Sequence, residues 1–324
     1  MNYPISEAIG LSSPLLSEIS PTDYKFSVLK RRANVIALMF ETASIWHPNS
    51  NVQPIFEKYS HKISHCSQTL NFRLTDEGLK LSKTIFCRTR LCPICVWRKS
   101  LGWFAKAQVA FPEISKFRLI FLTLTVRNCK IWDLRETCKK FSANFLLFIK
   151  AIQYRLKSSF KGYLRSFECT RENSNYAHPH YHVVLAVDES YFSDFYLPFE
   201  EWRELWIRCT DGWGSSIRIN AVPINISSKD KTFLELLKYE LKPEDFKRDW
   251  KWLADYSLQV KGVQKFSSSG VFRKFFRFLD NENLNQDFIH YKNEEEILFD
   301  SPSGKEYQDF IWCPSTRHYV LYQK

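Results

Sequence analysis

Residues 178–187 read HPHYHVVLAV, and this stretch decides the fold that we expect. The apolar run after the histidines predicts a strand, and side chains two apart on a strand project from the same face. His180 and His182 therefore direct two imidazoles toward one point, with Tyr181 on the opposite face. His178 shares their face if the strand begins early enough, although Pro179 leaves this open. Imidazole ligands suit Mn, Zn, Co or Ni, and an added carboxylate favours Mn or Mg.

A second predicted strand, residues 162–170, precedes the histidines, and residues 172–175 (ENSN) supply turn chemistry between the two. Such a hairpin brings Glu168 back beside the histidine pair, so Glu168 is the best candidate for a third ligand. Glu172 and Asp188 are weaker candidates. The alternative is a chance run of histidines on an exposed strand. Three alternating histidines, among only eight in the chain, favour the metal site.

The segments around this hairpin mix strands with helices. Apolar residues recur at steps of three or four over residues 133–156, which predicts an amphipathic helix. The mixture favours an α+β layered fold over a doubly wound parallel sheet. We also expect strands over residues 117–126 and 216–222, and helices over residues 96–109 (ending near Pro112), 199–209, 231–241 and 270–280, the last basic and aromatic.

Residues 233–242 (FLELLKYELK) place a tyrosine and a carboxylate on one helical face. Glu235 and Tyr239 are four apart, and Lys242 lies three beyond Tyr239. A phenol attacks phosphorus when a metal polarises the phosphate, and Glu235 is placed to act as a base on Tyr239 or on a water. Read alone, the pattern fits equally a packing tyrosine beside a surface ion pair of Glu235 and Lys238.

A cysteine cluster lies upstream. Cys87 precedes the C-x-x-C pair Cys92 and Cys95, and Cys66, or else His61 or His65, completes a set of four ligands. A closed four-ligand zinc site is structural, because no position remains for water. Buried or redox cysteines are the alternative, but the spacing favours zinc. Basic residues suited to contacting nucleic acid surround the cluster: Arg88, Arg90, Arg98 and Lys99.

Composition agrees with a folded protein that binds a polyanion. The 324 residues are 44% hydrophobic and 16% aromatic, and the net charge is +11. This excess of positive charge favours nucleic acid as a partner. The N-terminus lacks a signal-peptide pattern, and no apolar run is long enough to span a bilayer. Nine cysteines, an odd number, suit a reducing compartment, so we expect a cytoplasmic protein with no membrane partner.

Four segments resemble the rolling-circle replication initiators of small bacterial plasmids, within the HUH endonuclease superfamily. Residues 121–128 (FLTLTVRN) resemble the family's first motif, and residues 162–182 resemble its metal-binding motif. The helix with Glu235, Tyr239 and Lys242 resembles its catalytic motif, and residues 66–98 resemble its cysteine-rich segment. The resemblance covers about residues 60–280. The tyrosine follows the histidines, as in replication initiators, whereas in conjugative relaxases it precedes them.

The resemblance implies a central antiparallel sheet with flanking helices, a catalytic Mn²⁺ or Mg²⁺ and a structural Zn²⁺. The cation would bind His180, His182, Glu168 and His178, and polarise one phosphodiester of single-stranded origin DNA. Tyr239 would attack and remain linked to the 5′ phosphate, with Lys242 beside it, and Glu235 would activate water for termination. Residues expected to contact the DNA are Arg90, Arg98, Lys99, Arg127 and Lys238.

We therefore expect four regions. Residues 1–60 are unassigned, 61–112 form the zinc module, 113–265 form the nicking domain and 266–324 form a basic helical region. The expected partners are hairpin and duplex origin DNA, a host helicase and a DNA polymerase. Two alternatives remain: a zinc-dependent DNA-binding regulator without nuclease activity, and a transposase of the same chemistry. The regulator leaves the histidine strand without a role.

Overall fold

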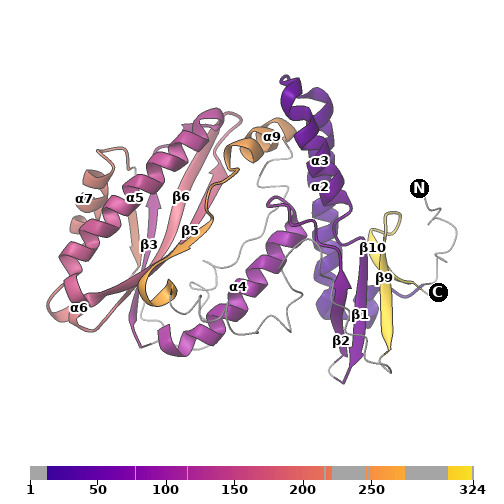
Figure 1. The fold of residues 1–324 in the computed structure, drawn as a ribbon, viewed down its shortest axis with the longest axis horizontal. Helices are drawn as coiled ribbons and strands as arrows, with labels where there is room; N and C mark the ends of the chain where they lie inside the picture. The colour runs from indigo at the N-terminus through magenta and orange to yellow at the C-terminus, as the bar shows by residue number, and fades with distance from the viewer. Residues whose placement is uncertain are drawn as a thin grey trace. The chain divides into compact units, whose positions relative to one another are not determined.

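The computed structural model describes residues 13–76, 78–114, 116–214, 217–220, 246, 249–273 and 306–322 (Figure 1). They form two compact units. The first contains the described residues up to Arg98 together with 306–322, and the second contains the rest. Each unit is an antiparallel sheet flanked by helices, which confirms the α+β class. Among the described residues, no helix is both long and apolar enough to cross a membrane.

The first unit is built from segments of the N-terminal and C-terminal parts of the chain. Its four-stranded sheet has the order β10-β9-β1-β2, so strands from the C-terminal part pair with a strand near residue 70. Its helices are α1 (Leu16–Ile19), α2 (Tyr24–Trp46), α3 (Gln53–Ser64) and the start of α4 (Pro93–Ile114), with 3-10 turns η1 (Pro21–Asp23) and η2 (Ser50–Val52). Its strands are β1 (Thr69–Thr75), β2 (Gly78–Thr84), β9 (Tyr307–Cys313) and β10 (His318–Tyr322).

Aromatic side chains form the core of the first unit. Phe40 of α2 stacks on Phe56 of α3 with ring centroids 6.1 Å apart, which fixes the helix pair. Phe72 of β1 packs edge-on against both Phe26 of α2 and Phe310 of β9. The sheet and the helix pair therefore share one buried interior.

One expectation for this part of the sequence is wrong. Residues 307–322 form β9 and β10 instead of belonging to a basic helical region. Aromatic and β-branched residues around the turn at 314–317 are a local hairpin signal that the expectation overlooked, and β9 and β10 pair with each other as well as with β1. The expected helix is confirmed: α4 ends at Ile114, two residues beyond Pro112.

The second unit is built on a sheet with the order β7-β3-β6-β5-β8, and β4 also pairs with β6. The strands are β3 (Arg118–Thr125), β4 (Cys129–Lys130), β5 (Phe160–Arg171), β6 (Tyr176–Val187), β7 (Ile217–Asn220) and β8 (Phe266–Ser268). Its helices are α5 (Leu134–Leu156), α6 (Ser190–Ser193), α7 (Phe199–Cys209) and α9 (Trp250–Gln259), with 3-10 turns η3 (Ile131–Asp133) and η4 (Lys157–Ser159). The hairpin, the central strands and the two long helices lie where the sequence predicts them. Residues 270–273 begin the expected basic helix, and the rest of it lies outside the described residues.

Helix α5 covers one face of this sheet (Figure 1). Phe141 of α5 stacks on Tyr181 of β6 at 3.8 Å, and Phe145 packs edge-on against the same ring. Because strand side chains alternate, the burial of Tyr181 against α5 turns His180 and His182 to the opposite face. The amphipathic pattern of α5 thus determines which face carries the histidines.

Gly162 of β5 allows the chain after β8 to approach closely. A Cβ on Gly162 would lie 2.4 Å from the carbonyl oxygen of Ser269, and the φ of Gly162 is +151°. Ser269 donates its amide to the carbonyl of Tyr163 over 2.8 Å. This contact holds β8 against β5 and supports the strand that carries Glu168.

Candidate metal centres and family

Glu168, His180 and His182 meet on the face of the β5–β6 hairpin opposite α5, where His180 is buried and the other two are partly exposed. Glu168 is paired directly with His180 in the register, and His182 is the next residue on the same face. The Oε2 atom of Glu168 lies 3.0 Å from Nε2 of His182 and 3.3 Å from Nε2 of His180. One ligand atom from each residue falls within 4.8 Å of the others. This arrangement is the one that the sequence predicts for the hairpin.

The hairpin reaches this register without a glycine in its turn. The Oδ1 atom of Asn173 accepts hydrogen bonds from the amides of Asn175 and Tyr176, over 2.9 and 3.1 Å. An asparagine side chain that bonds the backbone two residues on replaces a backbone turn. The local sequence therefore closes the hairpin, and the register places Glu168 beside the histidines.

Each histidine is oriented by a hydrogen bond at Nδ1, the ring nitrogen that does not face Glu168. The carbonyl oxygen of His178 lies 3.2 Å from Nδ1 of His180, and Oδ1 of Asn128 lies 2.6 Å from Nδ1 of His178. These oxygens only accept, so Nδ1 carries the hydrogen and Nε2 presents a lone pair. The hydroxyl of Thr123 contacts Nδ1 of His182 at 3.3 Å. Partners of this kind fix the tautomer and ring angle of metal-binding histidines.

The electrostatics of the group suit a cation. Hydrogen bonds with His180, then with His182, hold the pKa of Glu168 well below its usual range, so the group is a carboxylate at neutral pH. The lone pair on Nε2 of His180 faces Oε2 of Glu168 at 3.3 Å, and this contact requires a proton or a metal ion between the two atoms. Two imidazoles and one carboxylate form a donor set that fits Mn²⁺ and related ions.

His178 lies at the edge of this group. Its ring centroid is 5.5 Å from that of His180, and its nitrogens do not belong to the compact set of ligand atoms. Burial, then the neighbouring His180, lowers the pKa of His178, which keeps its ring neutral at pH 7. Of the weaker candidates, Asp188 is held in an ion pair with Lys161 at 2.9 Å, and Glu172 is exposed at the turn.

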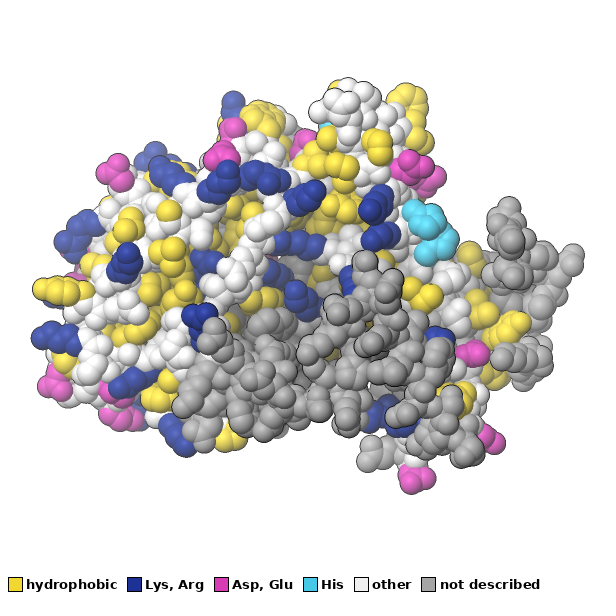
Figure 2. All heavy atoms as spheres, viewed as in Figure 1, with side chains coloured by type: hydrophobic (Ala, Val, Ile, Leu, Met, Phe, Trp, Pro, Cys, Tyr) yellow, Lys and Arg dark blue, Asp and Glu magenta, His cyan; other side chains and the backbone are white. Residues whose placement is uncertain are grey.

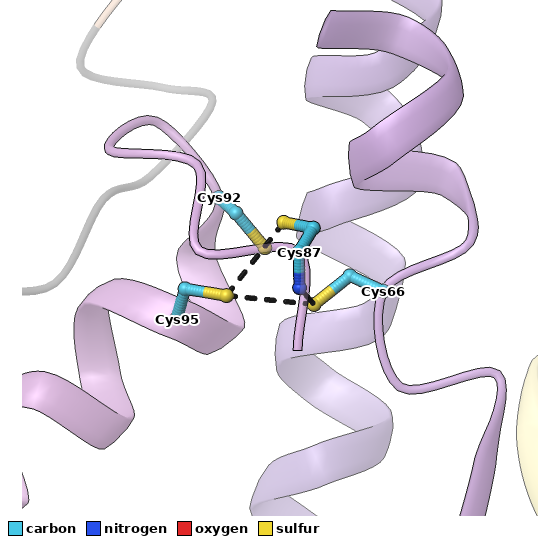
Figure 3. A group of neighbouring side chains, drawn as sticks. All are labelled: Cys66, Cys87, Cys92 and Cys95. Atoms are coloured by element: carbon cyan, nitrogen blue, oxygen red, sulfur yellow. Dashed lines mark hydrogen bonds between the residues drawn. The ribbon is translucent and has the colours of Figure 1, made fainter. Parts of the chain in front are cut away.

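Four cysteine sulfurs converge in the first unit (Figure 3). Cys66 follows α3, Cys87 follows β2, and Cys92 and Cys95 lie at the start of α4. The sulfur of Cys95 is 3.6 Å from those of Cys66 and Cys87, too far for a disulfide. A tetrahedral ion with Zn–S bonds of about 2.3 Å separates its sulfurs by about 3.8 Å, so the four thiols fit zinc. His61 and His65 stack on each other and lie outside this group.

A buried lysine adjoins the cysteine group. Lys30 of α2 is fully buried and its Nζ donates to the carbonyls of Ser64 and Cys66, each over 2.7 Å. Burial lowers the pKa of Lys30 to about 8, against the attraction of the Cys66, Cys92 and Cys87 thiolates. Lys30 therefore places a positive charge beside sulfurs that become anionic when they bind a metal, and ties α2 to the turn that bears Cys66.

Comparison with known proteins identifies the chain's family. The family model described as "Replication protein" matches residues 78–320, a span that contains both the hairpin and most of the cysteine group. The chain belongs to this family of plasmid replication initiators.

Several replication proteins are similar to this one over most of their length. A "Protein rep" of Bacillus amyloliquefaciens is 33% identical, over 90% of this chain and 92% of its own length. Those of Streptococcus pneumoniae and Lentilactobacillus hilgardii are 30% and 29% identical, over 83% and 79% of this chain and 86% and 88% of their own lengths. No solved structure matches the chain.

The remaining predicted site residues of this replication protein are basic residues that the structure describes and residues of the predicted catalytic helix, which lie outside the described residues. Arg90 and Arg127 are exposed, and Arg98 is half-buried, with its guanidinium over the rings of Phe86 and Trp97. Lys99 is exposed. Glu235, Tyr239, Lys242 and Lys238 lie outside the described residues, so their roles stay predictions.

Sequence reasoning missed the residues that orient the ligands. Asn128 and Thr123 belong to the segment that resembles the family's first motif, but no role for them follows from their spacing. Thr123 is paired with His182 in the register between β3 and β6. The alternation of side chains along β3 predicts that Thr123 and Thr125 share one face of the sheet. Only the pairing of β3 with β6 shows that this face is the one that carries the histidines.

Proposed function

We propose that this replication protein starts rolling-circle replication of a plasmid by nicking one strand of origin DNA through Tyr239. The observation that carries the proposal is the convergence of Glu168, His180 and His182 within one sheet face. Membership of the replication protein family supports replication over transposition. A divalent cation held by these three residues, Mn²⁺ or Mg²⁺, would polarise the scissile phosphodiester.

In the proposed reaction the phenol oxygen of Tyr239 attacks phosphorus. A bond forms between that oxygen and the phosphorus, and the bond from phosphorus to the 3′ oxygen breaks. The products are a 5′ phosphate linked to Tyr239 and a free 3′ hydroxyl, which primes synthesis by the host polymerase behind a host helicase. The proton of the phenol passes to Glu235 or to water.

Termination requires a second step at the same centre. Glu235, four residues before Tyr239, is proposed to activate a water that hydrolyses the regenerated phosphodiester, and Lys242 to stabilise the developing charge. The 3′ hydroxyl formed by this hydrolysis then attacks the phosphotyrosine, the bond from phosphorus to Tyr239 breaks, and the circular strand is released. Zn²⁺ is proposed to bind Cys66, Cys87, Cys92 and Cys95, a closed donor set that leaves no position for water and is therefore structural.

The test is a nicking assay on supercoiled plasmid with the cognate origin, in the presence of Mn²⁺ or Mg²⁺. Tyr239→Phe should abolish both nicking and covalent attachment, whereas Tyr154→Phe, an exposed tyrosine of α5, should change neither. Glu235→Ala should nick but release circles poorly. Covalent attachment that survives in the Tyr239→Phe protein would contradict the proposal.

A further inference from the structure

The row of histidines on β6 continues into an exposed tyrosine. Tyr176 lies two residues before His178 and so projects from the same face as His178, His180 and His182. Its side chain is 36% exposed, whereas Ala177, on the α5 side of the sheet, is buried. At about 3.3 Å per residue, Tyr176 lies about 13 Å along the strand from His180. The candidate metal centre therefore has an aromatic neighbour on its own surface.

Strand β4 adds a cation and a second aromatic ring beside Tyr176. Lys130 is paired directly with Tyr176, so both side chains share this face of the sheet. Trp132 follows in η3 with 52% of its surface exposed, and the Nζ of Lys130 lies 5.4 Å from the centre of its ring. Among the described residues, Trp132 has no other ring contact. Trp132 therefore presents an exposed indole ring, with an apolar face and a polar edge, next to a lysine.

The backbone holds this surface in a fixed place relative to the histidines. Buried Ile131 donates its amide to the carbonyl of Asn175 over 2.8 Å, which ties η3 to the hairpin turn. Asn128, just before β4, bonds His178 at 2.6 Å. The two aromatic rings and the candidate ligands thus belong to one rigid part of the sheet.

The charged residues around Tyr176 and Trp132 indicate whether this surface binds the phosphates or the bases of a nucleic acid. Glu172 and Asp133 are exposed near it and offset the single charge of Lys130, so the surface does not attract phosphates strongly. Aromatic faces stack on unpaired bases of any sequence, and this requires little net charge. A duplex hides its base faces, so the partner that fits is single-stranded DNA.

We propose that Tyr176, Lys130 and Trp132 form a stacking platform for unpaired bases next to the phosphate bound at Glu168, His180 and His182. The proposal deepens the proposed function and rests on it for the position of that phosphate. The platform positions the DNA strand, and Tyr176, Lys130 and Trp132 do not touch the reacting atoms.

The test measures the affinity of the full-length protein for a fluorescein-labelled, mixed-sequence single-stranded oligonucleotide, by anisotropy without added Mn²⁺ or Mg²⁺ so that no nicking occurs. Trp132→Ala and Tyr176→Ala should each weaken binding about fivefold to a hundredfold, the range expected for loss of one base–aromatic stack. Trp132→Phe should retain most of the affinity. Tyr154→Ala, which removes an 83% exposed ring from α5, should leave the affinity unchanged.

An abasic oligonucleotide of the same length separates stacking from phosphate contact. It should bind the wild type and Trp132→Ala equally, because it has no bases to stack. Equal losses with both oligonucleotides, or no loss with either, would overturn the platform. The anisotropy assay does not depend on Tyr239, so a failed nicking assay with intact Trp132 dependence would reject the proposed function and leave the platform standing.

Discussion

The Nε2 atom of His182 lies 3.0 Å from Oε2 of Glu168, although the two residues are 14 apart in the sequence. The contact follows from the hairpin register, which pairs Glu168 with His180, and from the side-chain hydrogen bonds of Asn173 in the turn. The sheet therefore places the three residues together before any metal binds. Preorganised ligands of this kind lower the cost of binding a cation.

Loss of either histidine should remove the Mn²⁺ site. His180→Ala and His182→Ala each delete one of three protein ligands, so the affinity for Mn²⁺ should fall by at least about a hundredfold, beyond the effect of losing an orienting partner. Electron paramagnetic resonance titration with Mn²⁺ measures this. His47→Ala, in the first unit, is the matched control. Full Mn²⁺ binding by both variants would place the ion elsewhere.

Acid should reduce the contribution of Glu168 to stability in the metal-free protein. Its pKa is lowered in the folded state, so its stabilising effect is fully present above its ordinary pKa near 4.5 and is lost as the pH falls below this value. The stability difference between the wild type and Glu168→Gln should therefore shrink on acidification below about pH 4.5. Urea unfolding in EDTA at a series of pH values would reveal it. A difference that grows in acid would show that Glu168 is not held as a carboxylate.

The cysteine group should hold one zinc ion per chain. Cys92→Ser and Cys95→Ser each break the donor set, and zinc content measured by atomic absorption should fall close to zero. Thermal unfolding of the first unit should shift down by several degrees, because binding energy at a structural site is folding energy. Cys209→Ser, a free cysteine of α7, should change neither quantity. Unchanged zinc in the Cys92 and Cys95 variants would dismiss the site.

Lys30 should contribute more to the free energy of unfolding when zinc is bound than when it is absent. Lys30→Met leaves the buried carbonyls of Ser64 and Cys66 without their donor, which should cost about 2 kcal/mol in the zinc-loaded protein. In zinc-stripped protein the loss should be smaller, because cysteines that regain their protons no longer attract the buried ammonium of Lys30. Denaturant unfolding of both forms measures the two losses. Lys58→Met, on the exposed side of α3, is the control. Equal losses in the two forms would reduce Lys30 to a packing role.

The candidate metal centre could be predicted from sequence because its geometry is local. Alternation along β6 selects His180 and His182, and one short turn returns Glu168 to them. The turn itself did not carry the usual glycine, because the side chain of Asn173 closes it instead.

Non-local contacts limited the prediction elsewhere. Strand β9 pairs with β1, and Asn71 bonds Asp309 across 238 residues, so the local sequence of residues 307–322 could not show which strand they pair with. The same applies to Lys30, a lysine within a helix whose partners are two carbonyls beyond the next helix. Sequence patterns of charge predict lysines at the surface, and only the tertiary structure shows this one beside the cysteines.

The identity of the DNA-linked residue tests the account most directly. Wild-type protein incubated with Mn²⁺ and single-stranded DNA of the cognate origin, then digested with nuclease and protease, should yield one nucleotide-modified peptide. Mass spectrometry should place the modification on Tyr239, and the Glu168→Ala protein should yield no such peptide. A nucleotide attached to any other residue, or an undiminished yield from Glu168→Ala, would contradict a metal-dependent tyrosine nickase built on this hairpin.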